Sequence, residues 1–226
     1  NQQITLPGGV SFPIYWLYFS AVDDCGPGTA RFGRHAIGVA WSLAPDAPVE
    51  SISSSPLITH SKGVIDPEIV RLSNTDFRLA YSVDWGGGGP NNSGRREIRI
   101  NNLSAPDAKG ASDVRMLQAR SVNDGGWERG VVEAPSIISR NGTGYLFYSG
   151  GIFNGTYQIN YASCTNLSSL CSREGDGPWI ADGWEGLTNP GGQDLIKFGN
   201  DAALMFYHRD NSVGSRRMVM SIVEWQ

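Results

Sequence analysis

Four short segments of the chain share a core of apolar and aromatic residues followed by a small or polar residue. Each segment is rich in residues that favour strands and is too short for a helix. They are Tyr15–Ser20, Phe77–Ser82, Tyr145–Ser149 and Leu204–His208. Equivalent positions of consecutive segments lie roughly 60 residues apart, which indicates an internal structural repeat.

Further strand-like segments stand at matching places around these four. One follows after a turn rich in Gly, Asn and Asp, at His35–Ser42, Glu97–Ile100, Tyr157–Ser163 and Met218–Ile222. Another precedes each of the later three, at Val64–Val70, Val131–Ile138 and Gln193–Phe198. Three or four antiparallel strands repeated at this period are typical of propeller blades. The sequence therefore predicts a single all-β propeller domain with about four blades, at residues 1–60, 61–128, 129–186 and 187–226.

Composition and charge argue against two classes of partner. The chain has 226 residues and a formal net charge of -4. No apolar run approaches the roughly 18 residues of a membrane-spanning helix. The chain also has no cluster of Lys and Arg of the kind that binds nucleic acid or an anionic membrane surface. We expect neither a nucleic-acid partner nor a membrane partner.

Two features favour a secreted glycoprotein. Asn-x-Ser/Thr acceptor sequences start at Asn91, Asn102, Asn141, Asn154 and Asn166, although an Asn-rich chain also holds such sequences by chance. Cys164 and Cys171 are close enough in sequence to form a disulfide across one loop, which an oxidising compartment favours, and Cys25 is left over. The sequence therefore predicts an extracellular protein with one disulfide.

Asp66 and Glu133 occupy matching places in two of the predicted blades. Each lies 13 residues before the central apolar residue of the following strand, Leu79 or Leu146. The innermost strand of a blade lines the central channel, so we expect the two carboxylates to converge there. Taken singly, each would be interpreted as the cap of a strand or turn. Together they predict the converging carboxylates that glycoside hydrolysis requires.

Around these residues the chain resembles glycoside hydrolase family 43, whose members are five-bladed β-propellers. The first motif is Ile65–Ile69 leading into Phe77–Ser82, and the second is Val132–Ile137 leading into Gly144–Ser149. The two motifs in this order are fairly specific, and the similarity extends from Tyr15 to Trp225. The resemblance implies that Glu133 is the general acid and that Asp66 tunes its pKa and orients it.

The resemblance also implies what the chain lacks. The family's third carboxylate, the general base, sits on a first blade upstream of every matched residue. We therefore expect a five-bladed propeller of which about four blades are present, with an exposed sheet face and weak or no activity. The family's Gly-His pair in the last blade is replaced by Gly191–Asp194, so no metal ion or other cofactor is predicted.

The implied reaction is the inverting hydrolysis of arabinosyl or xylosyl bonds in plant cell-wall oligosaccharides or polysaccharides, by a monomer. The main alternative is a non-catalytic propeller that binds carbohydrate or another protein. Families acting on fructosides or sialosides need an early Asn-Asp pair or an Arg cluster, and the chain has neither. His208 is a candidate substrate-binding residue or a core histidine. Trp85, Trp127, Trp179 and Trp184 lie in Gly-rich loops but more often such residues pack between blades than bind sugar.

Overall fold

The computed structural model describes residues 3–5, 9, 11–22, 35–51, 55–83, 95–124, 126–153, 155–211 and 215–225. Cys25, Trp85 and the acceptor residues Asn91 and Asn154 lie outside this part of the chain.

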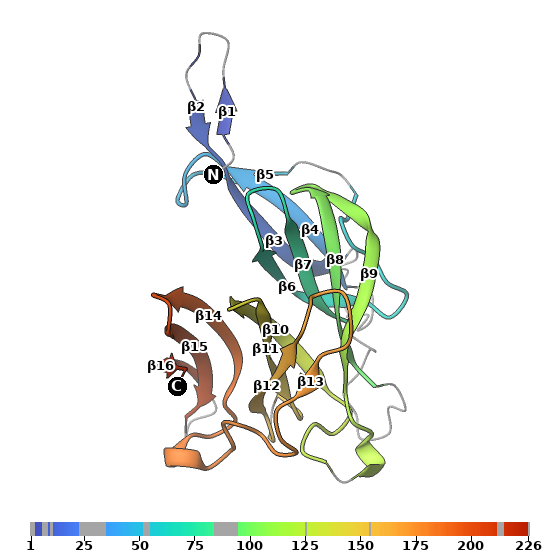
Figure 1. The fold of residues 1–226 in the computed structure, drawn as a ribbon, viewed down its shortest axis with the longest axis vertical. Helices are drawn as coiled ribbons and strands as arrows, with labels where there is room; N and C mark the ends of the chain where they lie inside the picture. The colour runs from blue at the N-terminus through green and yellow to red at the C-terminus, as the bar shows by residue number, and fades with distance from the viewer. Residues whose placement is uncertain are drawn as a thin grey trace.

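Four antiparallel sheets follow one another along the chain (Figure 1). Sheet 1 consists of β3 (Tyr15–Val22), β4 (His35–Ser42) and β5 (Glu50–Ser51). Sheet 2 consists of β6 (Val64–Arg71), β7 (Phe77–Val83), β8 (Glu97–Ala105) and β9 (Ala108–Gln118). Sheet 3 consists of β10 (Val132–Arg140), β11 (Thr143–Gly150), β12 (Gln158–Cys164) and β13 (Ser172–Arg173). Sheet 4 consists of β14 (Gly191–Phe198), β15 (Ala202–Asp210) and β16 (Arg216–Glu224).

Little else in the described residues is regular. A hairpin of β1 (Gln3–Thr5) and β2 (Ser11–Pro13) projects away from the sheets (Figure 1). The helical segments there are two single 3₁₀ turns, η1 (Val122–Asp124) and η2 (Trp184–Gly186). No helix within these residues has the length and apolarity needed to cross a bilayer. The predicted all-β class is confirmed.

Each pair of neighbouring sheets shares one apolar core. Sheets 1 and 2 enclose a cluster around Leu79, sheets 2 and 3 one around Leu146, and sheets 3 and 4 one around Met205. These three residues are the repeated apolar positions of the sequence, and all three are fully buried. Alternation along each strand therefore supplies both faces of the inner sheets with apolar side chains, as stacked blades require.

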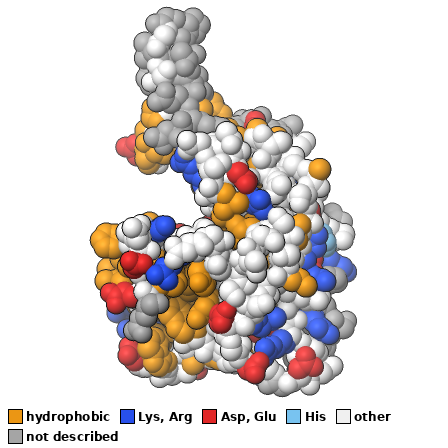
Figure 2. Space-filling model, in the orientation of Figure 1, with side chains coloured by type: hydrophobic (Ala, Val, Ile, Leu, Met, Phe, Trp, Pro, Cys, Tyr) orange, Lys and Arg blue, Asp and Glu red, His pale blue; other side chains and the backbone are white. Residues whose placement is uncertain are grey.

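The outer face of sheet 4 is left uncovered. Ile196 and Met218 hold the strand positions that Ile138 and Ile159 hold in sheet 3. Ile138 and Ile159 are buried, whereas Ile196 is 55% and Met218 is 77% exposed. Figure 2 shows a notch in the molecule, with hydrophobic side chains on the arm that sheet 4 forms. An exposed apolar face of this kind was expected if the described sheets form part of a larger ring.

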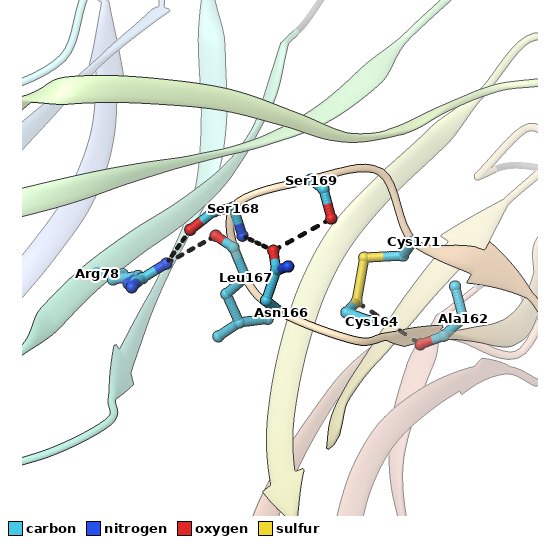
Figure 3. The surroundings of a disulfide bond; sticks show 8 residues. All are labelled: Arg78, Ala162, Cys164, Asn166, Leu167, Ser168, Ser169 and Cys171. Carbon is cyan, nitrogen blue, oxygen red and sulfur yellow. Dashed lines mark hydrogen bonds between the residues drawn. A yellow bond between two sulfur atoms is a disulfide. The ribbon is translucent and has the colours of Figure 1, made fainter. Parts of the chain in front are cut away.

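The predicted disulfide is present, between Cys164 and Cys171. The loop that it closes rests on sheet 2, because Arg78 Nη1 donates hydrogen bonds to the Leu167 carbonyl (2.8 Å) and to Ser168 Oγ (3.1 Å) (Figure 3). The backbone N–H of Cys171 also donates to the Met116 carbonyl of β9, at 2.8 Å. The disulfide therefore stiffens a loop that joins two sheets.

Candidate active site

The first strands of sheets 2, 3 and 4 carry the same irregularity. Their ladders shift by one residue between Ile65 and Glu68, between Glu133 and Ser136, and between Gly191 and Asp194. Each shift is a β-bulge, in which two residues of one strand face a single residue of its partner. The bulge pairs are Asp66-Pro67, Ala134-Pro135 and Gly192-Gln193. Bulges are frequent beside active sites because they redirect side chains.

The first residue of each bulge has a left-handed backbone. The φ angles are 56° at Asp66, 51° at Ala134 and 62° at Gly192. Gly adopts this conformation freely and Asp tolerates it, whereas Ala has no side-chain group to compensate. A non-Gly residue held there costs about 1–3 kcal/mol, and such strain clusters at functional sites. Of the three bulges, the one after Glu133 is therefore the one that most needs external support.

The structure corrects the register inferred from the sequence. Asp66 is equivalent to Ala134, and Glu133 is equivalent to Ile65, so the two carboxylates sit one residue apart along their strands. The equal count of 13 residues arose because the β6–β7 hairpin turn, Leu72–Asp76, is longer than the Asn141-Gly142 turn of β10–β11. The position of Gly192, by contrast, is equivalent to that of Asp66.

Asp66 nevertheless reaches the strand that carries Glu133. Asp66 Oδ2 accepts a hydrogen bond from the backbone N–H of Ala134, at 2.9 Å. The Asp66 side chain thus crosses from sheet 2 to the residue directly after Glu133 in sheet 3. The structure therefore places Asp66 next to the strand segment that carries Glu133, while the convergence of the two carboxylates in a central channel stays a prediction.

The Glu133 carboxylate is almost completely buried and has polar partners. The residue is only 6% exposed. Its Oε1 accepts a hydrogen bond from the Tyr157 hydroxyl at 2.9 Å, and its Oε2 is ion-paired with the Arg96 guanidinium. Burial and the negative charge of Asp66 raise the pKa of Tyr157, so its hydroxyl stays a donor. Each carboxylate oxygen of Glu133 therefore has a polar partner in the folded chain.

His208 lies beside this group. Its imidazole stacks on the Tyr157 ring, with centroids 5.6 Å apart and planes 14° apart. Its Nδ1 is buried with no hydrogen-bond partner among the described residues. Burial and the nearby Arg216 lower the pKa of His208, so the neutral imidazole is favoured. A side chain at Gly192 would collide with this ring, because an added Cβ would lie 2.8 Å from His208 Cδ2.

Sequence reasoning did not find Arg96 and Tyr157. Tyr157 reads as the first residue of an ordinary alternating strand, and its contact with Glu133 spans 24 positions. Arg96 follows a Gly-rich stretch as half of an Arg-Arg pair, and that pair directly before a strand was the only available signal.

A second row of polar residues crosses the three sheets one step beyond the bulges. Glu68, Ser136 and Asp194 hold equivalent positions on β6, β10 and β14. Ser136 Oγ donates to Asp194 Oδ1 at 3.2 Å. Burial and the charge of Asp194 raise the pKa of Glu68 from 4.5 to about 8. Glu68 therefore carries a proton near neutral pH.

Glu68→Gln is expected to flatten the pH dependence of stability. The folded state keeps a proton on Glu68 that the unfolded chain releases above about pH 4.5, so wild-type stability falls as the pH rises towards about 8. Glutamine does not titrate, so the variant lacks this decrease in stability with rising pH. Urea unfolding at about pH 5 and pH 9 measures the difference. An equal decline in both proteins would show that Glu68 does not hold the proton.

No group of three or more His, Cys, Asp or Glu suited to a metal ion occurs among the residues that the structure describes.

Of the Trp candidates that are described, Trp127 stacks on Tyr148 at 5.9 Å and belongs to the core between sheets 2 and 3. Trp179 packs against Tyr161 and Phe147 while remaining 42% exposed, and Trp184 is 49% exposed.

The fold and the site together define a propeller-like protein in which Asp66 of one blade contacts the bulge beside Glu133 of the next. The model of Glycosyl hydrolases family 43 matches residues 13–226. The chain belongs to this family. No curated protein matches the chain in sequence.

Solved structures agree in fold. A thermostable family-43 glycoside hydrolase has a TM-score of 0.78 at 18% identity, over 94% of this chain and 69% of its own. The α-L-arabinofuranosidase of Lactobacillus brevis has a TM-score of 0.70 at 16% identity, over 99% of this chain and 71% of its own. The α-L-arabinanase of Cellvibrio cellulosa, solved with arabinohexaose, has a TM-score of 0.67 at 16% identity, over 99% of this chain and 73% of its own. These proteins are five-bladed β-propellers, so the predicted architecture, with about four blades in this chain, is confirmed.

Proposed function

We propose that the chain hydrolyses arabinosyl or xylosyl O-glycosidic bonds of plant oligosaccharides or polysaccharides with inversion of configuration. Glu133 is the general acid in this proposal, and Asp66 tunes its pKa and orients it. The observation that carries the proposal is the contact of Asp66 with the backbone of Ala134, which joins two carboxylate-bearing blades at one half-buried bulge. Family membership and solved relatives that include arabinanases and an arabinofuranosidase support the substrate class.

The surroundings of Glu133 suit a group that gives up a proton. In this proposal the negative charge of Asp66 disfavours ionisation of Glu133 and so opposes the Arg96 guanidinium, which favours the carboxylate. Once the proton has passed to the leaving oxygen, the Arg96 guanidinium and the Tyr157 hydroxyl stabilise the carboxylate that remains. Interactions that grow as charge develops are those that accelerate a reaction.

The attacking water requires a general base on the opposite side of the sugar. In inverting enzymes the two carboxyl groups lie about 6.5–9.5 Å apart to hold that water. The proposal assigns no residue of the described sheets to this base.

The direct test is incubation of the chain with arabino- and xylo-oligosaccharides while proton NMR follows the anomer first released. The proposal predicts release of a sugar with inverted configuration. Retention of configuration would contradict the mechanism. Tight binding without any release, even over long incubation, would support the non-catalytic carbohydrate-binding alternative.

Asp66→Asn is expected to move one limb of the pH–rate profile. Without the negative charge of Asp66 the pKa of Glu133 falls, so activity is lost at a lower pH than in the wild type. The profile of kcat/KM against pH on one oligosaccharide measures this shift. An unmoved limb would remove Asp66 from its proposed role.

We also propose that the protein is a secreted, monomeric glycoprotein. The disulfide between Cys164 and Cys171 supports an oxidising compartment. The acceptor residues Asn102, Asn141 and Asn166 are all exposed, as glycan attachment requires. His208 remains a candidate for contact with the sugar, because it lies beside Tyr157.

A further inference from the structure

The residue after Glu133 is held from both neighbouring sheets. Its N–H donates to Asp66 Oδ2 of sheet 2, at 2.9 Å, and its carbonyl accepts from Gln193 Nε2 of sheet 4, at 2.6 Å. A bulge takes backbone groups out of the ladder, so other donors and acceptors have to replace the lost partners. For Ala134, two side chains from different blades do so.

Gln193 is itself fixed in place. It is 3% exposed, and its Oε1 accepts a hydrogen bond from Ser149 Oγ at 2.7 Å. Ser149 Oγ in turn accepts from the backbone N–H of Gly192, at 2.9 Å. Ser149 also pairs with Glu133 across the β10–β11 ladder. The amide of Gln193 is thus oriented at both ends by a network that surrounds Glu133.

The repeat shows that this amide is not needed to form a bulge. The equivalent second positions of the other two bulges are Pro67 and Pro135. Proline restricts φ through its ring and brings no donor. A buried amide costs free energy unless it is hydrogen-bonded, and the amide of Gln193 is hydrogen-bonded to Ala134 and Ser149 of sheet 3. The bulge that has Gln in place of Pro is therefore the one whose second residue contacts Ala134.

We propose that Gln193 is a positioning residue for Glu133. Gln193 donates a hydrogen bond to the carbonyl of Ala134, and Asp66 accepts one from its N–H. Together the two hydrogen bonds stabilise the left-handed conformation of the bulge and so fix the direction of the Glu133 side chain. The effect of these two hydrogen bonds on catalysis rests on the proposed function of Glu133. Their effect on the conformation of the bulge does not depend on that function.

The first test is independent of turnover. Gln193→Met keeps the approximate volume of the side chain and removes its hydrogen bonds. Exchange of the Ala134 amide proton, followed by NMR, is expected to become about tenfold faster. Asn160→Leu is the matched control, because it removes another buried amide of the same core region that does not contact Ala134 or Glu133. An unchanged exchange rate in Gln193→Met would overturn the proposal.

The second test separates positioning from stability. A sugar leaving group needs the general acid, whereas a dinitrophenyl leaving group hardly does. Gln193→Met is expected to lower kcat/KM on an arabino-oligosaccharide by about 10- to 100-fold, with little change on the dinitrophenyl arabinofuranoside. Equal losses on both substrates would indicate a structural role only and would overturn positioning. If Gln193→Met does not fold, Ser149→Ala, which frees the Gln193 amide, is measured in the same two tests with the same criteria.

The two proposals fail in different ways. If Glu133→Gln leaves oligosaccharide hydrolysis unchanged, the proposed function falls, while the exchange rate of Ala134 still decides whether Gln193 holds the bulge. If Glu133→Gln abolishes hydrolysis and Gln193→Met changes neither measurement, only the positioning role falls.

Discussion

Replacing Glu133 with glutamine is expected to lower kcat/KM on arabino- or xylo-oligosaccharides by about 10²–10⁴-fold, the usual contribution of general acid catalysis. Glutamine keeps the shape of the side chain and a partner for the Tyr157 hydroxyl but has no proton of suitable acidity to give. The loss should therefore be large on sugar leaving groups and small on a dinitrophenyl glycoside, which departs without protonation.

Glu97→Gln is the matched control for this change. Glu97 is also buried, at 7% exposed, and also ion-paired with an arginine, Arg99, but it is not part of the Asp66–Glu133 pair. It should retain nearly full activity on both substrates. A loss in Glu97→Gln as large as in Glu133→Gln, or an unchanged rate in Glu133→Gln, would show that Glu133 is not the acid.

Replacing Glu128 with alanine is expected to lower the free energy of unfolding by about 3–5 kcal/mol, the typical effect of removing one partner of a buried ion pair. Glu128 is fully buried. It accepts hydrogen bonds from Arg173 Nε at 2.6 Å, from the Tyr148 hydroxyl at 3.0 Å and from the backbone N–H of Arg120 at 2.6 Å. Alanine leaves these donors without their acceptor and opens a cavity between sheets 2 and 3.

Urea unfolding measures this loss, with Asp176→Ala as control. Asp176 pairs with Arg120 at 2.8 Å but its side chain is 97% exposed, so its removal should change stability by less than about 1 kcal/mol. Similar values for the two variants would mean that the Glu128 network contributes little to the packing of the sheets.

The repeat of the sequence was enough to predict the blades, because each blade needs apolar residues at the same strand positions. Leu79, Leu146 and Met205 lie at the centres of the three cores, where the repeat placed them. The positions of Asp66 and Glu133 could be predicted only to within one residue, since a count along the chain includes the hairpin turn. The β6–β7 turn differs in length from the β10–β11 turn, and no periodicity reveals that difference.

The rest of the site could not be predicted, because it depends on contacts between segments far apart in the sequence. Tyr157 directly precedes β12, Arg96 directly precedes β8, and Gln193 lies in the bulge of β14, and each reaches Glu133 or Ala134 from there. The bulge dipeptides Asp66-Pro67 and Ala134-Pro135 are visible in the sequence. Gly192-Gln193 shares the geometry without the proline, so the third bulge has no sequence signal of this kind.

The central claim is that Glu133 donates a proton to the glycosidic oxygen. A crystal structure of the Glu133→Gln variant soaked with an arabino-oligosaccharide tests it most directly. We predict a sugar chain bound across the axis, with a glycosidic oxygen about 2.6–3.2 Å from the side-chain amide at position 133. A sugar bound on the outer wall of the blades, with position 133 still closed off by Arg96 and Tyr157, would contradict the account.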